Sequence, residues 1–304
     1  MNHGLPTRDG VSPSCVSLPS GNWPTITDFL VERFPAISRQ VWLARMRGAL
    51  VADEFGVPVT LDRPYTGHIR IYYYRALEAE PRIPFDETVL YQDDHLVVAD
   101  KPHFLPVTPS GRFLQETLLV RLKNRLALNQ LTPIHRIDRE TAGLVVFCIH
   151  PAERDAYQGL FRQRAVTKHY EAIAPWRADL AYPLSRRSRI EEDEPFFRQR
   201  EVPGAPNSES RVDVIEVLGE DHGGTGFARF ARYALNPVTG KKHQLRVHMH
   251  ALGLPILNDR MYPPVAITPD DDYRLPLQLL AKSIAFTDPV TGENRLFESR
   301  LKLA

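Results

Sequence analysis

This 304-residue sequence has few cysteines, no long apolar runs and almost no net charge. Each of these features limits the classes of protein to which the chain can belong. The two cysteines, Cys15 and Cys148, lie far apart without the spacing of metal ligands. They imply no disulfide framework, which favours a reducing compartment, the cytoplasm. No run of about 18 apolar residues occurs, so we expect no membrane span. The N-terminus lacks the basic-then-apolar pattern of a secretion signal, so we expect no export.

The formal net charge of +1 argues neither for nor against a nucleic-acid partner, because the distribution of charge matters more than its sum. Basic residues gather in four segments, which are 39–47, 112–125, 162–168 and 186–189. Acidic runs elsewhere balance them. Solvated faces of mixed sign are one interpretation of this pattern, and a basic groove is the other.

Signatures of several enzyme classes are missing. No Gly-x-Ser-x-Gly nucleophile elbow occurs. The cluster Gly223–Gly226 lacks the lysine and hydroxyl of a P-loop, so we expect a hairpin turn there. His135–Asp138 is not a kinase catalytic loop, because its aspartate comes one residue late and no Asp-Phe-Gly follows. No carboxylate or cysteine stands at a zinc-type spacing from His243, His248 and His250, so we expect no metal site.

Composition and turn residues divide the chain into two parts. The first 22 residues carry Pro, Ser and Gly with little periodicity, which indicates a flexible tail over 1–22. A small module of helices and strands is predicted over 23–75, a Pro-bearing linker over 76–87, and a larger domain over 88–304.

Local patterns predict the secondary structure of these parts. Apolar spacing from Ile26 to Phe34 predicts a short helix, and Ser38 is a suitable N-cap for a second helix that ends at Gly48. Strand-like runs lie at 50–51, 69–73, 88–91, 96–99, 169–174, 212–218, 228–235 and 284–286. Because helices and strands do not follow the regular βα alternation, the predicted fold class is α+β with a mixed, mainly antiparallel sheet.

The segment His135–Phe147 carries the strongest functional signal. Asp138 stands between Arg136 and Arg139, shortly before Gly143 and a buried apolar run. Cations beside a carboxylate favour its ionised form. The aspartate therefore lies on a polar loop at the lip of a sheet, where functional residues are common. The alternative is that Asp138 caps or bridges this loop structurally.

A cation and an aromatic ring open a predicted strand at Lys168-His169-Tyr170. Alternate residues of a strand share a face, so Lys168 and Tyr170 point the same way. A lysine beside a tyrosine suits the binding and stacking of a nucleobase. An edge strand with one amphipathic aromatic is the plainer alternative.

Hydrogen-bond donors follow the predicted turn at Thr239-Gly240. His243, Gln244 and Arg246 can all bond to phosphate or to base edges. Arg246 is also suited to hold Asp138 through a bidentate pair.

Together these segments resemble the motifs of RluA-type RNA pseudouridine synthases. The family segment H-R-L-D-x-x-T-x-G-L is matched by His135–Leu144, with Ile137 for Leu, and K-x-Y by Lys168-His169-Tyr170. The segment T-G-R-x-H-Q-I-R-V-H is matched by Thr239–His248, with Lys241 for Arg and Leu245 for Ile, and N-K-P by Asp100-Lys101-Pro102. The order and spacing agree over about residues 88–290, and about 24–74 resembles an S4-type RNA-binding module more weakly.

The resemblance implies a synthase core with flanking helices and a central cleft over 88–304, and an S4-like α/β module over 23–75. It implies an enzyme that isomerises uridine in RNA to pseudouridine, with no metal and no cofactor. By the family pattern Asp138 is the nucleophile, Tyr170 stacks on the target uracil, and Arg246 orients Asp138. Contacts to the RNA or the substrate are then expected from Arg136, His135, Thr141, Lys168, Lys241, His243 and Gln244.

Several alternatives stay open at this stage. Attack on the sugar, attack on the uracil ring and a glycal route are all compatible with an aspartate nucleophile. A non-catalytic RNA-binding or ribosome assembly factor that keeps the fold is a rival, as is a metal-dependent hydrolase. Asp138, Tyr170 and Arg246 favour the enzyme, because binding of an anionic ligand needs no buried carboxylate. The expected partner is ribosomal or transfer RNA, and the expected state is a cytoplasmic monomer.

Overall fold

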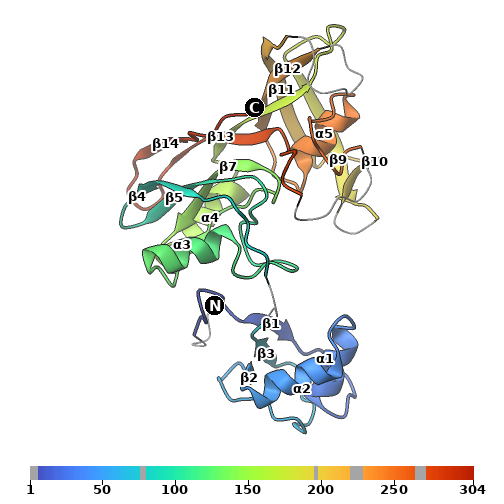
Figure 1. Ribbon diagram of the computed structural model, residues 1–304, viewed down its shortest axis with the longest axis vertical. Helices are drawn as coiled ribbons and strands as arrows, with labels where there is room; N and C mark the ends of the chain where they lie inside the picture. The colour runs from blue at the N-terminus through green and yellow to red at the C-terminus, as the bar shows by residue number, and fades with distance from the viewer. Residues whose placement is uncertain (1–5, 76–79, 195–197, 220–228, 264–271) are drawn as a thin grey trace. The chain divides into compact units, whose positions relative to one another are not determined.

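The structure is a computed structural model that describes residues 6–75, 80–194, 198–219, 229–263 and 272–304 (Figure 1). The chain divides into two compact units. Unit 1 comprises Met1–Glu80 and Pro109–Gln115, and unit 2 comprises Pro81–Thr108 and Glu116–Ala304. The predicted turn at Gly223–Gly226 and residues 76–79 of the predicted linker lie outside the described residues.

The part of unit 1 that the structure describes is a three-stranded antiparallel sheet with two helices. Its elements are β1 (Ser14–Ser17), α1 (Ile26–Arg33), α2 (Arg39–Arg47), β2 (Val51–Asp53) and β3 (Arg70–Tyr73), and the strand order is β1-β3-β2. The N-terminus of α1 is fixed by a capping box between Thr25 and Asp28. At α2 the predicted N-cap is confirmed, since the Ser38 side chain accepts a hydrogen bond from the backbone N–H of Val41.

The segment expected to be a flexible tail contributes to this unit. Ser14 pairs with Tyr73 at one end of β1, and Ser17 pairs with Arg70 at the other. Leu18, which is 1% exposed, lies in the same apolar core as Trp42. The tail prediction is therefore wrong for this stretch. Four small residues carry no clear periodicity, and only pairing with β3, more than fifty residues away, makes them a strand.

In its described residues, unit 2 is built on one large sheet flanked by three helices. Its first elements are β4 (Thr88–Gln92), β5 (Leu96–Lys101), α3 (Leu118–Leu126), β6 (Thr132–Pro133), β7 (Ala142–Cys148), α4 (Arg154–Arg162) and β8 (Thr167–Pro175). The rest are β9 (Leu184–Glu192), β10 (Gln199–Val202), β11 (Ser208–Val217), β12 (Phe230–Pro237), α5 (Gln244–Ala251), β13 (Leu279–Thr287) and β14 (Asn294–Glu298).

The strand order in unit 2 confirms the predicted mixed, mainly antiparallel sheet. In the described residues it runs β10-β9-β11-β12-β8-β13-β7-β5-β4, with β14 paired to β13 and β6 paired to β7. The pair β13–β7 is parallel, and the others are antiparallel (Figure 1). This parallel pair joins the half of the sheet that contains β4 and β5 to the half that contains β8 to β12.

Gly143 explains how β7 and β13 come so close. Its φ is +108°, and a Cβ atom built there would lie 2.3 Å from the carbonyl oxygen of Ala281. Glycine adopts a positive φ without a steric penalty, and it has no Cβ atom to clash with Ala281. The glycine five residues after Asp138 therefore allows β7 to lie against β13, beside β8, and brings the preceding loop to this junction.

The sequence analysis gave no range for the helix α5. Leu245 and Met249 on α5 share an apolar cluster with Val212 of β11 and Leu235 of β12. The other buried residues of this helix include polar ones, among them Arg246. A helix that buries polar groups has no simple apolar stripe, so its period is hidden in the sequence.

Candidate active site

Asp138 lies on the loop between β6 and β7, and residues from α5 surround its carboxylate. Its side chain is 24% exposed. Arg246 Nη1 donates to Asp138 Oδ2 at 3.4 Å, and His243 Nε2 lies 3.9 Å from Asp138 Oδ1. The fold thus brings Asp138 together with His243 and Arg246, which lie more than a hundred positions later in the sequence.

Arg246 makes its bidentate pair with Asp259, not with Asp138. Its Nε donates to Asp259 Oδ2 at 2.8 Å and its Nη2 donates to Oδ1 at 2.6 Å. The third nitrogen, Nη1, is left to face Asp138 and lies 3.6 Å from Glu140 Oε2. The prediction that Arg246 contacts Asp138 is confirmed, but the predicted bidentate geometry is wrong, because Asp259 takes both parallel donors.

The Arg246 side chain is 1% exposed, so its charge depends on these carboxylates. Burial by itself lowers the pKa of the guanidinium. The charge and hydrogen bonds of Asp259, followed by the charge of Asp138, more than offset this and raise the pKa above its ordinary value. The guanidinium is therefore a permanent cation with a fixed orientation.

A further layer of residues fixes Asp259 and His243. Asp259 Oδ1 also accepts a hydrogen bond from the backbone N–H of Met261. The Tyr262 ring lies 5.5 Å from the Arg246 guanidinium carbon, and its hydroxyl lies 3.0 Å from His243 Nδ1. The sequence analysis assigned no function to Asp259 or Tyr262. Their one local signal was an aspartate close to a tyrosine after an apolar turn.

Tyr170 lies on β8 and packs against the apolar cluster that α5 also joins. Burial, and then the negative charge of Asp138, raise the pKa of its phenol. The hydroxyl thus stays protonated at neutral pH. The same charge effect couples Tyr170 electrostatically to Asp138.

Lys168 shares its strand with Tyr170, two residues away, and reaches the turn before α5. Its Nζ donates to the carbonyl oxygen of Thr239 at 3.3 Å. Burial lowers the pKa of the ammonium. Lys168 thus ties β8 to the turn at residues 239–240.

Lys101 supports the loop that carries Asp138. Its side chain is buried at the end of β5, and Nζ donates to the carbonyl oxygens of Pro102 and Arg139 at 2.9 and 3.0 Å. Burial lowers the pKa of Lys101 to about 7, although the charges of Glu140 and Asp138 oppose that shift. Lys101, the last residue of β5, therefore holds the backbone of Arg139, one residue after Asp138.

Gln244 is occupied within the protein. Its Nε2 donates to the Glu209 carbonyl and to Ser210 Oγ, and its Oε1 accepts from Thr239 Oγ1 and from the backbone N–H of Lys241. An amide side chain offers two donors and two acceptor lone pairs, and all four are used. The Gln244 amide therefore has no donor or acceptor left for the predicted contact with RNA. It instead fixes the turn before α5.

His135 is likewise engaged inside the loop. Its Nε2 accepts a hydrogen bond from the backbone N–H of Val146, and its ring stacks on Phe161 of α4. Burial and the nearby charge of Lys168 lower the pKa of His135 to about 3, so the imidazole is neutral. Thr141 is buried at the start of β7.

Two of the predicted RNA contacts lie at the surface. Arg136, two residues before Asp138, and Lys241, in the turn before α5, are both exposed. They are free to meet a ligand that approaches Asp138. The central cleft itself stays a prediction.

The fold and the site together define an RNA-modifying enzyme of the pseudouridine synthase class. A family model described as RNA pseudouridylate synthase matches residues 95–251, which contain Asp138, Tyr170 and Arg246. The chain belongs to this family, and its curated relatives are RluA-type enzymes. It is thus an RNA pseudouridine synthase, which isomerises uridine in RNA to pseudouridine.

Curated relatives cover most of the chain. The dual-specificity RNA pseudouridine synthase RluA of Haemophilus influenzae is 32% identical over 215 residues, which span 70% of this chain and 92% of that protein. RluA of Escherichia coli (strain K12) is also 32% identical over 215 residues, with 69% and 91% covered. The solved structure of Human RNA Pseudouridylate Synthase Domain Containing 1 superposes with a TM-score of 0.56 at 21% identity, covering 72% of this chain and 85% of that one. This last likeness shows the fold.

Among the residues that the structure describes, no helix combines the length and the apolar character needed to cross a bilayer.

Proposed function

We propose that Asp138 is the nucleophile of this pseudouridine synthase, that Tyr170 stacks on the target uracil, and that Arg246 orients the carboxylate. The observation that carries the proposal is the contact between Arg246 Nη1 and Asp138 Oδ2 at 3.4 Å. A buried guanidinium held by a second carboxylate cannot swing away. It therefore presets the position of the attacking oxygen before the substrate arrives.

In this proposal the target uridine leaves its stack to reach Asp138, which costs a few kcal/mol and costs least in loops. The carboxylate attacks C1′ while the C1′–N1 bond breaks, as in a retaining glycosidase. The uracil anion turns, and C5 attacks C1′ and displaces Asp138. C5 then loses its hydrogen as a proton and N1 gains one. The atoms and electrons balance without an oxidant or a reductant.

The partly buried phenol of Tyr170 suits a stacking role. Its raised pKa keeps it neutral, so it places no second negative charge beside Asp138 or the uracil anion. The exposed Arg136 is proposed to fill the gap left by the extruded nucleotide. Lys241 and His243 are proposed to contact the RNA backbone, and unit 1 to act as an S4-like module that adds to the RNA surface.

The substrate is proposed to be ribosomal RNA, transfer RNA or both. The RluA relatives carry the name dual-specificity, and this chain covers 92% of the Haemophilus influenzae protein. We further propose that the enzyme acts as a monomer in the cytoplasm, where both kinds of RNA are abundant.

The test is tritium release from 5-³H-uridine-labelled RNA taken from cells that lack this protein. Wild type and Asp138→Asn are assayed side by side, and RNA binding is measured for both. We expect release by the wild type only, with binding retained by the variant, because C5 loses its hydrogen only when it bonds to the sugar. Release by Asp138→Asn at the wild-type rate would exclude Asp138 as the nucleophile. Absence of release by the wild type, with tight RNA binding, would point to an assembly factor.

A further inference from the structure

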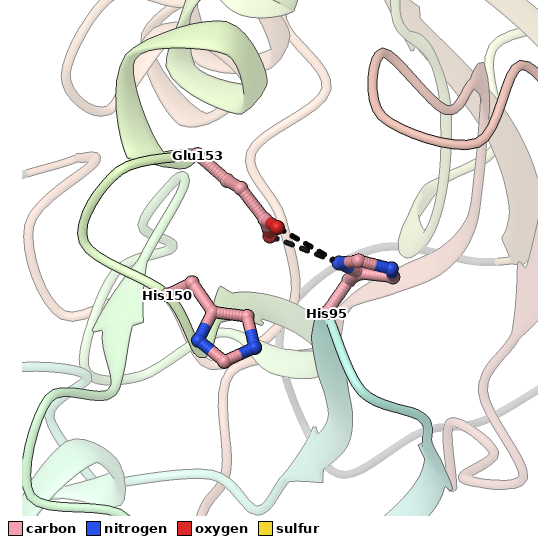
Figure 2. A group of neighbouring side chains, drawn as sticks. All are labelled: His95, His150 and Glu153. Atoms are coloured by element: carbon pink, nitrogen blue, oxygen red, sulfur yellow. Dashed lines mark hydrogen bonds and ion pairs between the residues drawn. The ribbon is translucent and has the colours of Figure 1, made fainter.

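Three side chains with metal-ligating atoms meet on unit 2, apart from the residues assigned to uridine chemistry. They are His95, which directly precedes β5, His150, which follows β7, and Glu153, the N-cap residue of α4 (Figure 2). One ligand atom from each lies within 4.8 Å of the other two. They are a different set from His243, His248 and His250, which the sequence analysis considered as metal ligands and set aside.

The backbone fixes the spacing of these three residues. Leu96 pairs with Cys148 across β5 and β7, and the backbone N–H of Ile149 donates to the His95 carbonyl at 2.9 Å. The backbone N–H of Glu153 donates to the His150 carbonyl at 3.1 Å. The Cα atoms of all three residues are thereby held by the sheet edge and the turn into α4. A site built on such elements loses little conformational entropy when it binds a ligand.

Two of the three ligands already touch. His95 Nδ1 lies 2.9 Å and 3.1 Å from the two carboxylate oxygens of Glu153. His150 is exposed, and its ring stands beside the pair (Figure 2). Tetrahedral zinc with bonds of about 2.0–2.1 Å needs ligand atoms about 3.3 Å apart. The His150 ring lies edge-on to the His95 ring, with their centroids 6.1 Å apart, and on binding it would have to move to reach this spacing.

We propose that His95, His150 and Glu153 form a binding site for a divalent transition-metal ion such as Zn²⁺, with water as the fourth ligand. Two imidazoles and one carboxylate are a donor set that zinc uses in proteins, and imidazole suits the neighbouring first-row ions as well. The exposed His150 leaves an entry path from solvent. The ion would cross-link the start of β5 to the N-terminus of α4 and stabilise unit 2.

The competing explanation is an ion pair between His95 and Glu153 that joins β5 to α4 without any metal. This explanation gives His150 no role. His150→Ala is therefore the discriminating variant, because it removes one ligand and leaves the ion pair in place. A matched control is His68→Ala, which removes another exposed histidine, from unit 1, that shares a hydrogen bond with Ser20.

The experiment uses the full chain after treatment with a chelator. Zn²⁺ is titrated by calorimetry, and Co²⁺ is added separately to read the coordination geometry from its visible absorption. We expect one equivalent of Zn²⁺ to bind, to raise the melting temperature, and to bind about 10-fold or more weakly in His150→Ala. A loss of 10-fold or more is what even the removal of a partner behind a metal ligand typically causes. His68→Ala should bind as the wild type does.

Circular dichroism of His150→Ala without metal checks that this surface change leaves the fold intact, and its pseudouridine synthase activity should be unchanged. Saturable binding that is weakened 10-fold or more in both His150→Ala and Glu153→Gln supports the site. No saturable binding to the wild type, or equal affinity in the wild type and His150→Ala, would leave only the ion pair and overturn the proposal.

Discussion

Arg246 binds Asp259 through Nε and Nη2 and presents Nη1 to Asp138, so one guanidinium connects two carboxylates. The contacts to Asp259 are 2.8 and 2.6 Å, and the contact to Asp138 is 3.4 Å. The two shorter contacts, to Asp259, anchor the guanidinium, and Asp138 is held more loosely. A loosely held carboxylate keeps a lone pair for chemistry, while the anchored cation keeps its position.

We expect Asp259→Asn to lower kcat by about 100-fold, because a displaced guanidinium would misplace Asp138, the proposed nucleophile. It should also lower the free energy of unfolding by about 3–5 kcal/mol, since Arg246 is left buried without its main partner. Tritium-release kinetics and urea denaturation measure the two effects. The control is Asp179→Asn, which breaks an exposed bidentate pair with Arg177 and should change neither quantity. Wild-type kcat in Asp259→Asn would show that Arg246 needs no anchor.

Gly143→Ala should destabilise the protein by about 3 kcal/mol or more, because the new Cβ would stand 2.3 Å from a backbone oxygen of β13 that cannot move freely. The matched control is Gly292→Ala, at φ +76° with no atom within 4 Å of the added Cβ, which should cost only about 1–2 kcal/mol of backbone strain. Urea denaturation gives both numbers. Equal losses in the two variants would mean that the approach of β7 to β13 is not close.

Lys101 predicts a specific dependence of stability on pH. Its pKa is about 7 in the folded protein, against 10.5 for an ordinary lysine, so between these values the unfolded chain binds more protons than the folded one. Stability then rises with pH across this window. We expect the free energy of unfolding of the wild type, relative to Lys101→Met, to rise from pH 7 to pH 10 by a few kcal/mol, at about 1.4 kcal/mol per unit of pKa shift. Urea denaturation between pH 7 and pH 10 measures this difference. If the free energies of unfolding of the wild type and Lys101→Met changed in parallel with pH, Lys101 would not be buried as a neutral amine.

RNA affinity should fall steeply as salt rises, because each phosphate contact releases counterions. Lys241→Ala removes one exposed cation of the turn before α5 and should reduce the slope of log K against log salt by about 1. Lys302→Ala removes an exposed lysine near the C-terminus and serves as the control. Filter binding between low and moderate salt measures the slope, and an unchanged slope in Lys241→Ala would place the RNA path elsewhere.

Local sequence was a good guide where a structure depends on near neighbours. The cap at Ser38, the helix from Ile26 and the buried run after Gly143 all follow from patterns within a few residues, and all are present. Four short motifs in the right order were enough to identify the family, because each one keeps the residues that its local turn or strand requires.

Long-range pairing escaped this reasoning. β1 is a strand only because β3 supplies its partners, and α5 is a helix with polar residues inside because β11 and β12 supply theirs. Gln244 looked like an RNA ligand by its chemistry, yet four protein groups occupy its amide. A residue type tells which bonds are possible, but the fold decides which of them are already made.

The sequence by itself determined the α+β class and the pseudouridine synthase family, and it singled out Asp138, Tyr170 and Arg246 as the candidate catalytic residues. These are carried by short patterns in which neighbouring residues constrain one another. Only the tertiary structure decided that Asp259 holds Arg246, that Lys101 holds the loop of Asp138, and that His95 meets His150 and Glu153. Such contacts depend on which strands pair and in which register. A buried charged group can form an ion pair or hydrogen bond with any suitable group that the fold places beside it, so its local sequence does not identify its partner.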